Sequence, residues 1–168
     1  MTQTESTFMP RSDYLKFYRK ITTHEREILI NWLIIIQVEF NLLPETLFIT
    51  VNIIDRYLSK QKISLNQLQL LGITAMFIAS KFQEIYPPIM TDFIQMTRNS
   101  FESTEMRSME CKVLTVIEFN VNCSPSQTFL ENYSRAINVS EPRVLIYASY
   151  LLDIALIKYD FLKFTTSR

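Results

Sequence analysis

The chain has 168 residues, of which 48% are hydrophobic and 20% are charged, and its 17 basic and 17 acidic side chains cancel. Disordered chains have lower hydrophobicity and a larger charge imbalance, so this composition predicts a folded protein of about one domain. The single glycine excludes phosphate-binding loops and dinucleotide fingerprints, which need several glycines where the backbone approaches a ligand. The zero net charge gives no electrostatic support for nucleic acid as a partner.

Three residues could serve as soft metal ligands: His24, Cys111 and Cys123. A zinc site of the Cys/His type needs four, so we expect neither metal nor cofactor. The two cysteines lack CxxC spacing and lie among apolar residues, which favours buried or inert thiols in a reducing compartment. The longest apolar runs are far shorter than the ~20 residues of a membrane span, and residues 1–19 lack a signal-peptide pattern. We therefore expect a soluble, intracellular and mostly helical protein without a membrane partner.

The predicted elements begin with a polar arm over residues 1–22, in which residues 14–18 could form a loosely attached helix. Hydrophobic spacing, prolines and capping residues then predict five helices joined by short loops. The five predicted helices begin near residues 23, 44, 64, 88 and 103.

The third of these helices carries the only glycine, Gly72, in a stripe of small residues with Ala75 and Ala79. Small side chains at this spacing let a neighbouring helix backbone come close. This helix is apolar on most sides, so we expect it at the centre with the others around it. The predicted fold class is all-α, with five helices around a central third helix rather than a four-helix bundle.

A second set of helical patterns begins after Asn122. A capping box at 124–127 predicts one helix, and Ser140-Glu141-Pro142 opens another that ends near Tyr159. Two helices in so short a tail cannot close a core of their own. We expect them to pack on the first five helices or to begin a second unit that is incomplete.

Two charged residues fall inside apolar helix faces. Lys81 shares a face with Phe77, and Glu110 lies between Met106 and Leu114. A lysine can extend its ammonium to solvent and a carboxylate can accept from a loop amide, so each charge alone has an ordinary explanation. A buried charge is costly without a partner. Either the two meet each other, or they lie at the rim of an apolar surface that receives another protein.

The first helix has more apolar surface than a small core can cover. One arc of its surface contains Ile28, Leu29, Trp32, Ile35 and Ile36, and a second arc is also apolar. An exposed apolar patch that contains a tryptophan usually marks a docking surface. The patch is a docking surface unless the N-terminal arm or the tail helices cover it.

These residues resemble the cyclin family, most closely the mitotic B-type cyclins. The segments that carry the resemblance are 25–33, 45–58, 68–88 and 109–119. The similarity implies an N-terminal cyclin box over 23–122 after the arm over 1–22. The tail over 123–168 resembles the first two helices of the family's second box, which is truncated here.

The family implies a regulatory subunit that binds and activates a cyclin-dependent Ser/Thr protein kinase in mitotic control and catalyses no reaction itself. Lys81 and Glu110 would bond the backbone around the kinase αC helix, and Arg26 and Asp55 would form an internal ion pair. Further apolar contacts to the kinase would come from Phe82, Leu114, Ile117 and Phe119. The resemblance also implies a location in the nucleus and cytoplasm.

The Trp32 face resembles the family's docking groove for substrates or inhibitors with Arg-x-Leu motifs. The matching positions are Ile28, Leu29, Trp32 and Gln69. Glu25 stands where the family usually has Met, and Ile35 stands where an acid often receives the arginine of the motif. The specificity of this groove is therefore an open question.

Other interpretations remain. A truncated second box could leave an adaptor or decoy that binds a kinase or transcription factor without activating a kinase. A DNA-binding adaptor would require a basic surface, against which the zero net charge argues. An enzyme could pair His24 with Glu25 or Asp55, although the sequence offers no evident nucleophile or oxyanion site.

Overall fold

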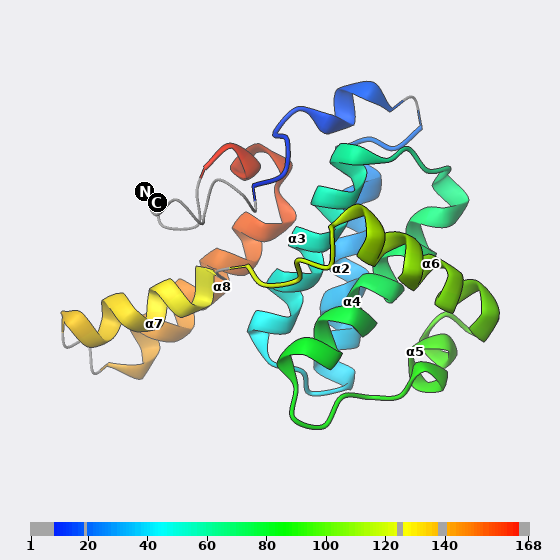
Figure 1. The fold of residues 1–168 in the computed structure, drawn as a ribbon. Helices are drawn as coiled ribbons and strands as arrows, with labels where there is room; N and C mark the ends of the chain where they lie inside the picture. Colours follow the sequence, from blue (N-terminus) through cyan, green and yellow to red (C-terminus); the bar gives the residue numbers. More distant parts are fainter. Residues whose placement is uncertain (1–8, 19, 124–125, 138–140, 165–168) are drawn as a thin grey trace.

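A computed structural model describes residues 9–18, 20–123, 126–137 and 141–164. These residues form helices and loops, and no strand occurs among them, which confirms the all-α fold class (Figure 1). In chain order the elements are η1 (Tyr14–Phe17), α2 (Thr23–Glu39), α3 (Pro44–Lys60), η2 (Leu65–Gln67), α4 (Leu68–Gln83), α5 (Met90–Met96), α6 (Ser103–Val116), α7 (Ser126–Ala136), α8 (Pro142–Ile157) and η3 (Tyr159–Lys163).

Helix α4 is the centre of the fold, as its sequence predicts. Every residue from 70 to 80 is buried, and α2, α3, α5 and α6 all pack against this helix (Figure 1). Gly72 lies where α2 approaches, because a Cβ atom at this position would meet Leu29 Cδ1 at 2.7 Å. The small side chain is therefore needed for the close contact between α2 and α4.

Side chains from neighbouring segments hold the helix N-termini. Thr22 caps α2 and exchanges hydrogen bonds with Glu25 in a capping box. The carboxylate of Glu84, just after α4, accepts hydrogen bonds from the backbone N–H of Leu43, at 2.9 Å, and from the hydroxyl of Thr46. Glu84 therefore ties the loop after α4 to the start of α3. The capping box expected at 124–127 lies partly outside the described residues.

The turns that follow several helices adopt left-handed backbone angles without glycine. The residues with positive φ are Asn41, Arg98, Asn99, Glu118 and Phe119. Asparagine tolerates this region, whereas a phenylalanine there is strained by about 1–3 kcal/mol. Arg56, on α3, supports the turn after α6 by donating to the carbonyl of Asn120 at 2.8 Å.

A buried ion pair joins α2 to α3. Arg26 donates two hydrogen bonds to the carboxylate of Asp55, at 2.9 and 2.8 Å, and both side chains are only 1% exposed. Tyr14 donates a further hydrogen bond to this carboxylate at 2.5 Å. Burial alone would lower the pKa of Arg26, but the charge and hydrogen bonds of Asp55 outweigh burial and raise that pKa.

The same arginine also holds the C-terminal end of α8. Arg26 donates to the carbonyls of Leu156 and Ile157, at 3.2 and 2.8 Å, where a helix leaves its last carbonyls without intrahelical partners. The Tyr159 hydroxyl accepts from the backbone N–H of Leu15, and its ring packs edge-on against Tyr14. The N-terminal arm, the first helical unit and the tail therefore meet at one buried point.

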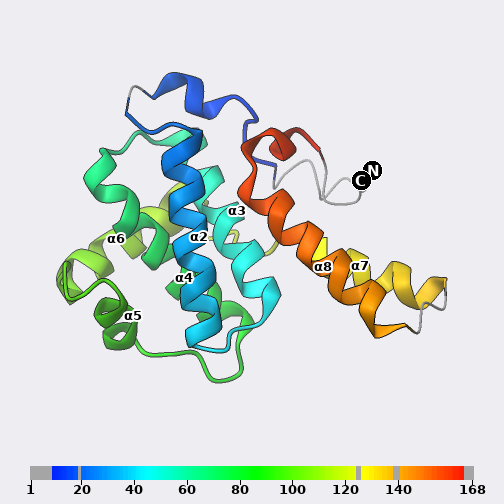
Figure 2. The ribbon, with the colours of Figure 1, turned by 180° about the vertical axis from the view of Figure 1, so that it is seen from behind.

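Helices α7 and α8 form a pair that extends away from the other helices (Figures 1 and 2). They pack on each other, and Gln127 of α7 donates to Ser149 of α8 at 3.2 Å. Only parts of the pair touch the first unit: α7 contacts α3, and α8 contacts α2. The tail packs on the first unit, as expected, but much of its surface remains outside that contact.

The two cysteines lie in different environments. Cys123 is half-buried, and desolvation raises the pKa of its thiol to about 11. Cys111 is exposed on α6, so of the two alternatives expected for the thiols, burial does not apply to this residue.

Replacing Arg26 with Met should lower the free energy of unfolding by about 3–5 kcal/mol, because the Asp55 carboxylate is left buried without its charge partner. Urea denaturation followed by circular dichroism measures this loss. The matched control is Arg135→Met, which removes an exposed ion pair with Glu131 and should barely move the midpoint. Equal midpoints for the two variants would contradict a structural role for the buried pair.

Candidate functional site

The candidate site is the surface where the end of α4 meets α6. Lys81 lies in the last turn of α4, and its ammonium contacts the carboxylate of Glu110 on α6. The Lys81 ammonium also lies 4.1 Å from the centroid of the Phe77 ring, which is a cation–π geometry. The sequence left two arrangements open for these charges, and the structure shows the first, in which Lys81 and Glu110 contact each other.

This ion pair remains open to solvent. The Lys81 side chain is 42% exposed and the Glu110 side chain 15% exposed. An ion pair at a surface contributes only about 0–1 kcal/mol to stability. A second polypeptide that offered a carbonyl to the ammonium and an N–H to the carboxylate could therefore replace the contact at little cost.

The apolar residues expected to contact the partner differ in their exposure. Phe82 and Phe119 are exposed, and Leu114 is half-buried. Ile117 is only 1% exposed and belongs to the core, so its expected contact with a partner is not available in this structure. Ile117 directly follows α6 and continues the buried stripe of Met106, Met109 and Val113 at helical spacing, so the sequence pattern itself could have placed it in the core.

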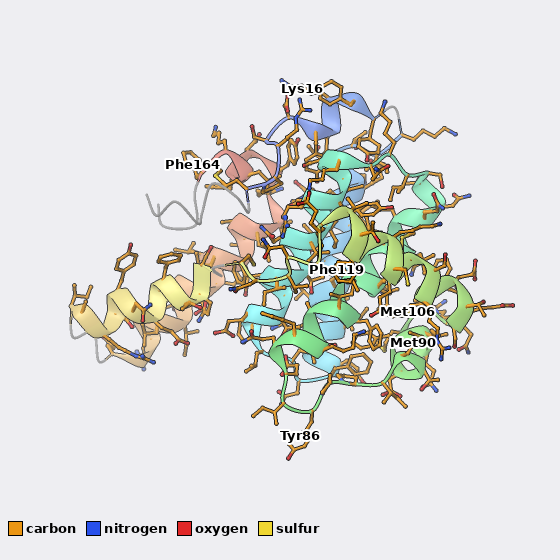
Figure 3. The ribbon with its side chains drawn as sticks, in the orientation of Figure 1. Lys16, Tyr86, Met90, Met106, Phe119 and Phe164 are labelled. Atoms are coloured by element: carbon orange, nitrogen blue, oxygen red, sulfur yellow. The ribbon has the colours of Figure 1, made fainter. Side chains whose placement is uncertain are left out.

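The loop between α4 and α5 adds exposed apolar residues that the sequence interpretation missed. Ile85, Tyr86 and Ile89 are all exposed, and Tyr86 reaches 92%. Tyr86 points away from the molecule at the tip of this loop (Figure 3). The hydrogen bonds of Glu84 fix the start of the loop. The signal was available in the sequence, because Pro87-Pro88 ends α4 and leaves apolar residues on a loop.

The predicted docking groove on α2 is only partly a surface. Ile28 and Ile35 are exposed and Trp32 is half-buried between them, which forms a stripe at i, i+4 and i+7. Leu29, expected in the groove, is only 5% exposed and packs against Gly72 instead. Gln69 is half-buried at the start of α4. Neither the arm nor the tail buries Ile28, so an apolar stripe remains accessible.

The acidic residues proposed for an enzyme are engaged elsewhere. Asp55 is buried against Arg26 and Tyr14. Glu25 accepts hydrogen bonds from Thr22, and these bonds lower the pKa of its carboxyl group, so it stays ionised at neutral pH. Within the described ranges, no group of three or more His, Cys, Asp or Glu could hold a metal ion, and no helix is long and apolar enough to cross a membrane.

Comparison with known proteins identifies the family. Residues 1–122 match the family described as "Cyclin, N-terminal domain". The chain belongs to the cyclin family. The matched region ends at the residue where the sequence predicts the first box to end, and it starts earlier, at residue 1. The resemblance to cyclins drawn from the sequence is confirmed.

Several relatives are mitotic cyclins. The chain is 40% identical to the G2/mitotic-specific cyclin-B of Marthasterias glacialis, over 99% of this chain and 42% of that protein. It is 42% identical to the G2/mitotic-specific cyclin-B of Hydra vulgaris, over 90% of this chain and 42% of the relative. Cyclin-B1 of Xenopus laevis is 39% identical, over 94% of this chain and 39% of its own length. The chain thus spans about two fifths of the length of these relatives.

A solved structure agrees with the fold. The X-ray structure of a viral cyclin from Herpesvirus saimiri superposes with a TM-score of 0.87 at 22% sequence identity. The match covers 96% of this chain and 72% of the viral protein. At this identity the likeness concerns the fold, and it extends through α7 and α8.

Leu29 and its neighbour Ile28 should respond differently to truncation. We expect Leu29→Ala to lower the free energy of unfolding by about 2–5 kcal/mol, because it leaves a cavity against Gly72. Ile28→Ala should change it by no more than about 0.5 kcal/mol, since the side chain is exposed. Thermal and urea unfolding of both variants measure the difference. A large loss for Ile28→Ala would mean that the stripe on α2 is core.

Proposed function

We propose that this cyclin is the regulatory subunit of a cyclin-dependent Ser/Thr protein kinase in mitotic control, binds the kinase through the α4–α6 face, and catalyses no reaction itself. The observation that carries this proposal is the ion pair of Lys81 and Glu110 at the surface between α4 and α6. The relatives named as G2/mitotic-specific cyclins support the assignment to mitosis. A location in the nucleus and cytoplasm belongs to the same proposal.

Activation would follow from selective binding. A protein kinase needs its strand lysine paired with the glutamate of helix αC, and its activation loop must not block the site. A partner shifts that equilibrium only by its difference in affinity for the two conformations. Lys81 and Glu110 carry opposite charges side by side, so they can bond a carbonyl and an N–H of the same backbone segment. Phe82 and Phe119 would add apolar contacts to the same kinase segment. These contacts form only when the segment is in the position that the active kinase requires.

A second role would belong to the stripe of Ile28, Trp32 and Ile35. An apolar stripe suits the leucine of an Arg-x-Leu motif in a substrate or inhibitor. The arginine of the motif needs an acid, and Ile35 offers none. Glu25 lies on the same helix at i−3 from Ile28 and is ionised, and both hydrogen bonds from Thr22 go to its Oε2, so we assign its Oε1 to that arginine.

The alternative function is an adaptor or decoy that binds a kinase or transcription factor without activating a kinase. The observation that favours it is that α7 and α8 touch the first unit over only part of their surface. Binding of the kinase and activation of the kinase therefore need separate measurements. The balanced charge argues against nucleic acid as a partner in either case.

Lys81→Glu and Glu110→Lys should each weaken binding to a cyclin-dependent kinase purified without its cyclin by at least tenfold. Surface plasmon resonance measures binding, and phosphorylation of a peptide substrate measures activation. The double variant restores the internal ion pair with reversed polarity, so it should fold normally and still fail to bind. Arg135→Glu, on the outer surface of α7, is the matched control and should bind like the unmodified chain.

Two outcomes of this experiment would contradict the proposal, each in a different way. Binding that survives all three changes on the α4–α6 face would exclude this face as the kinase surface. Tight binding of the unmodified chain without an increase in phosphorylation would favour the adaptor or decoy.

Trp32→Ala should leave phosphorylation of a short peptide without a docking motif unchanged. For a substrate that carries an Arg-x-Leu motif, it should raise KM about tenfold with little change in kcat, because the motif adds binding outside the catalytic site. Val38→Ala, an exposed change elsewhere on α2, is the control. Equal loss with both substrates would show that Trp32 supports the fold rather than docking.

A further inference from the structure

The turn that follows α6 has left-handed backbone angles at two residues in succession, and neither is glycine. The N–H of Phe119 donates to the carbonyl of Leu114 at 2.8 Å, and the N–H of Glu118 donates to that of Thr115 at 3.1 Å. These two bonds form a Schellman motif, in which glycine usually takes the left-handed position. Here φ is 59° at Glu118 and 56° at Phe119. Both angles cost free energy for residues with a Cβ atom, so the turn needs support from outside α6.

Helix α3 provides that support through a buried arginine. Arg56 donates to the carbonyl of Asn120 at 2.8 Å and to the carbonyl of Ile117 at 3.2 Å. The two carbonyls lie on either side of the left-handed residues along the chain, so one guanidinium spans the turn. A planar guanidinium serves two acceptors in a fixed geometry, which the ammonium of a lysine does not. The C-terminal end of α6 is thereby held against α3 (Figure 1).

Lys60 adds a weaker contact to the same turn. It lies one helical turn after Arg56 and donates to the carbonyl of Val116 at 3.1 Å and to the carboxylate of Glu118 at 2.9 Å. The Lys60 and Glu118 side chains are both exposed, and an ion pair of that kind contributes little to stability. The buried arginine is therefore the stronger of the two supports that α3 gives to the turn.

Phe119 takes its position from this turn. Its side chain is 71% exposed, so packing against the rest of the chain does little to place it. Helix α6 itself is held separately, because Met106, Met109 and Val113 are buried in the core. Losing the support of the turn would therefore displace Phe119 while α6 stays in place.

We propose that Arg56 is a positioning residue of the α4–α6 face: by holding the turn after α6, it places Phe119 for contact with the kinase. This inference rests on the proposed function, in which Phe119 contacts the kinase. Arg56 is buried and does not touch the kinase itself. A merely structural arginine would affect the stability of the chain, whereas a positioning residue also sets the affinity of the folded chain for its partner.

The experiment is a double-mutant cycle between Arg56→Met and Phe119→Ala. Surface plasmon resonance measures the Kd for a cyclin-dependent kinase purified without its cyclin. We expect each single change to raise the Kd about fivefold, and the double variant to raise it no further than Phe119→Ala alone, because residues that act as a unit are not additive. Arg56→Met and Lys81→Ala should instead multiply their effects, since Lys81 lies on α4 and is not held by the turn.

Two further variants separate positioning from stability. Arg56→Lys keeps a donor for one of the two carbonyls and should recover part of the affinity. Ile54→Ala opens a cavity in the core on the same helix, so it should lower the urea midpoint and leave the Kd of the folded chain unchanged. If Arg56→Met does not fold, the cycle uses Arg56→Gln, whose shorter side chain cannot reach both carbonyls.

Amide hydrogen exchange followed by NMR gives a measurement that does not involve the kinase. Arg56→Met should speed the exchange of the Phe119 and Asn120 amides at least tenfold more than that of Val113, because local opening frees the turn before the helix. Equal acceleration along the whole of α6 would show that Arg56 supports the helix in general, and this would overturn the proposal.

The binding results distinguish this inference from the proposed function. If Lys81→Ala weakens binding but Arg56→Met and Phe119→Ala do not, the proposed function stands and the role of Arg56 is wrong. Effects of Arg56→Met and Phe119→Ala that multiply, or a Kd for Ile54→Ala raised as much as that for Arg56→Met, would also overturn the positioning role. Normal binding by all of the variants, Lys81→Ala included, would remove the proposed function and this inference with it.

Discussion

The ion pair between Arg26 and Asp55 is the contact on which the arrangement of this chain depends. It joins α2 to α3 with both side chains buried, and a buried charge must keep its partner. The remaining N–H donors of the same arginine hold the C-terminal end of α8, while Tyr14 brings the N-terminal arm to the shared carboxylate. One guanidinium therefore sets where the arm and the tail lie relative to the first box. Arginine suits this role because its planar group donates in several directions at once.

A second pair of the same chemistry has the opposite character. Lys81 and Glu110 also join two helices, but the pair lies at the surface and contributes little to stability. The buried pair is structural because nothing can replace its partner without unfolding, whereas the surface pair can exchange its partner for another polypeptide. Exposure, rather than residue type, separates the structural pair from the candidate site.

Much of the fold could be predicted from local pattern, and part of the site could not. Capping residues, prolines and the small stripe around Gly72 predicted the helices and the central place of α4, because these signals act over one or two turns. Leu29 and Ile117 were expected on surfaces and lie in the core. An apolar side chain suits a core or a contact surface equally well, and the packing of neighbouring helices decides which of the two each residue joins. The exposed Ile85 and Tyr86 were missed because a loop has no periodicity to interpret.

The sequence by itself determined that this chain is helical, that its third helix lies at the centre, and that it belongs with the cyclins. The first two conclusions rest on spacing along the chain, which survives whatever the helices pack against, and the third rests on the resemblance of particular segments to the family. Only the tertiary structure decided that Lys81 meets Glu110, that Leu29 closes against Gly72, and that α8 leaves large apolar side chains exposed. Each of these depends on distances between helices far apart in sequence, and the free energy of packing that sets such distances comes from all the contacting residues together.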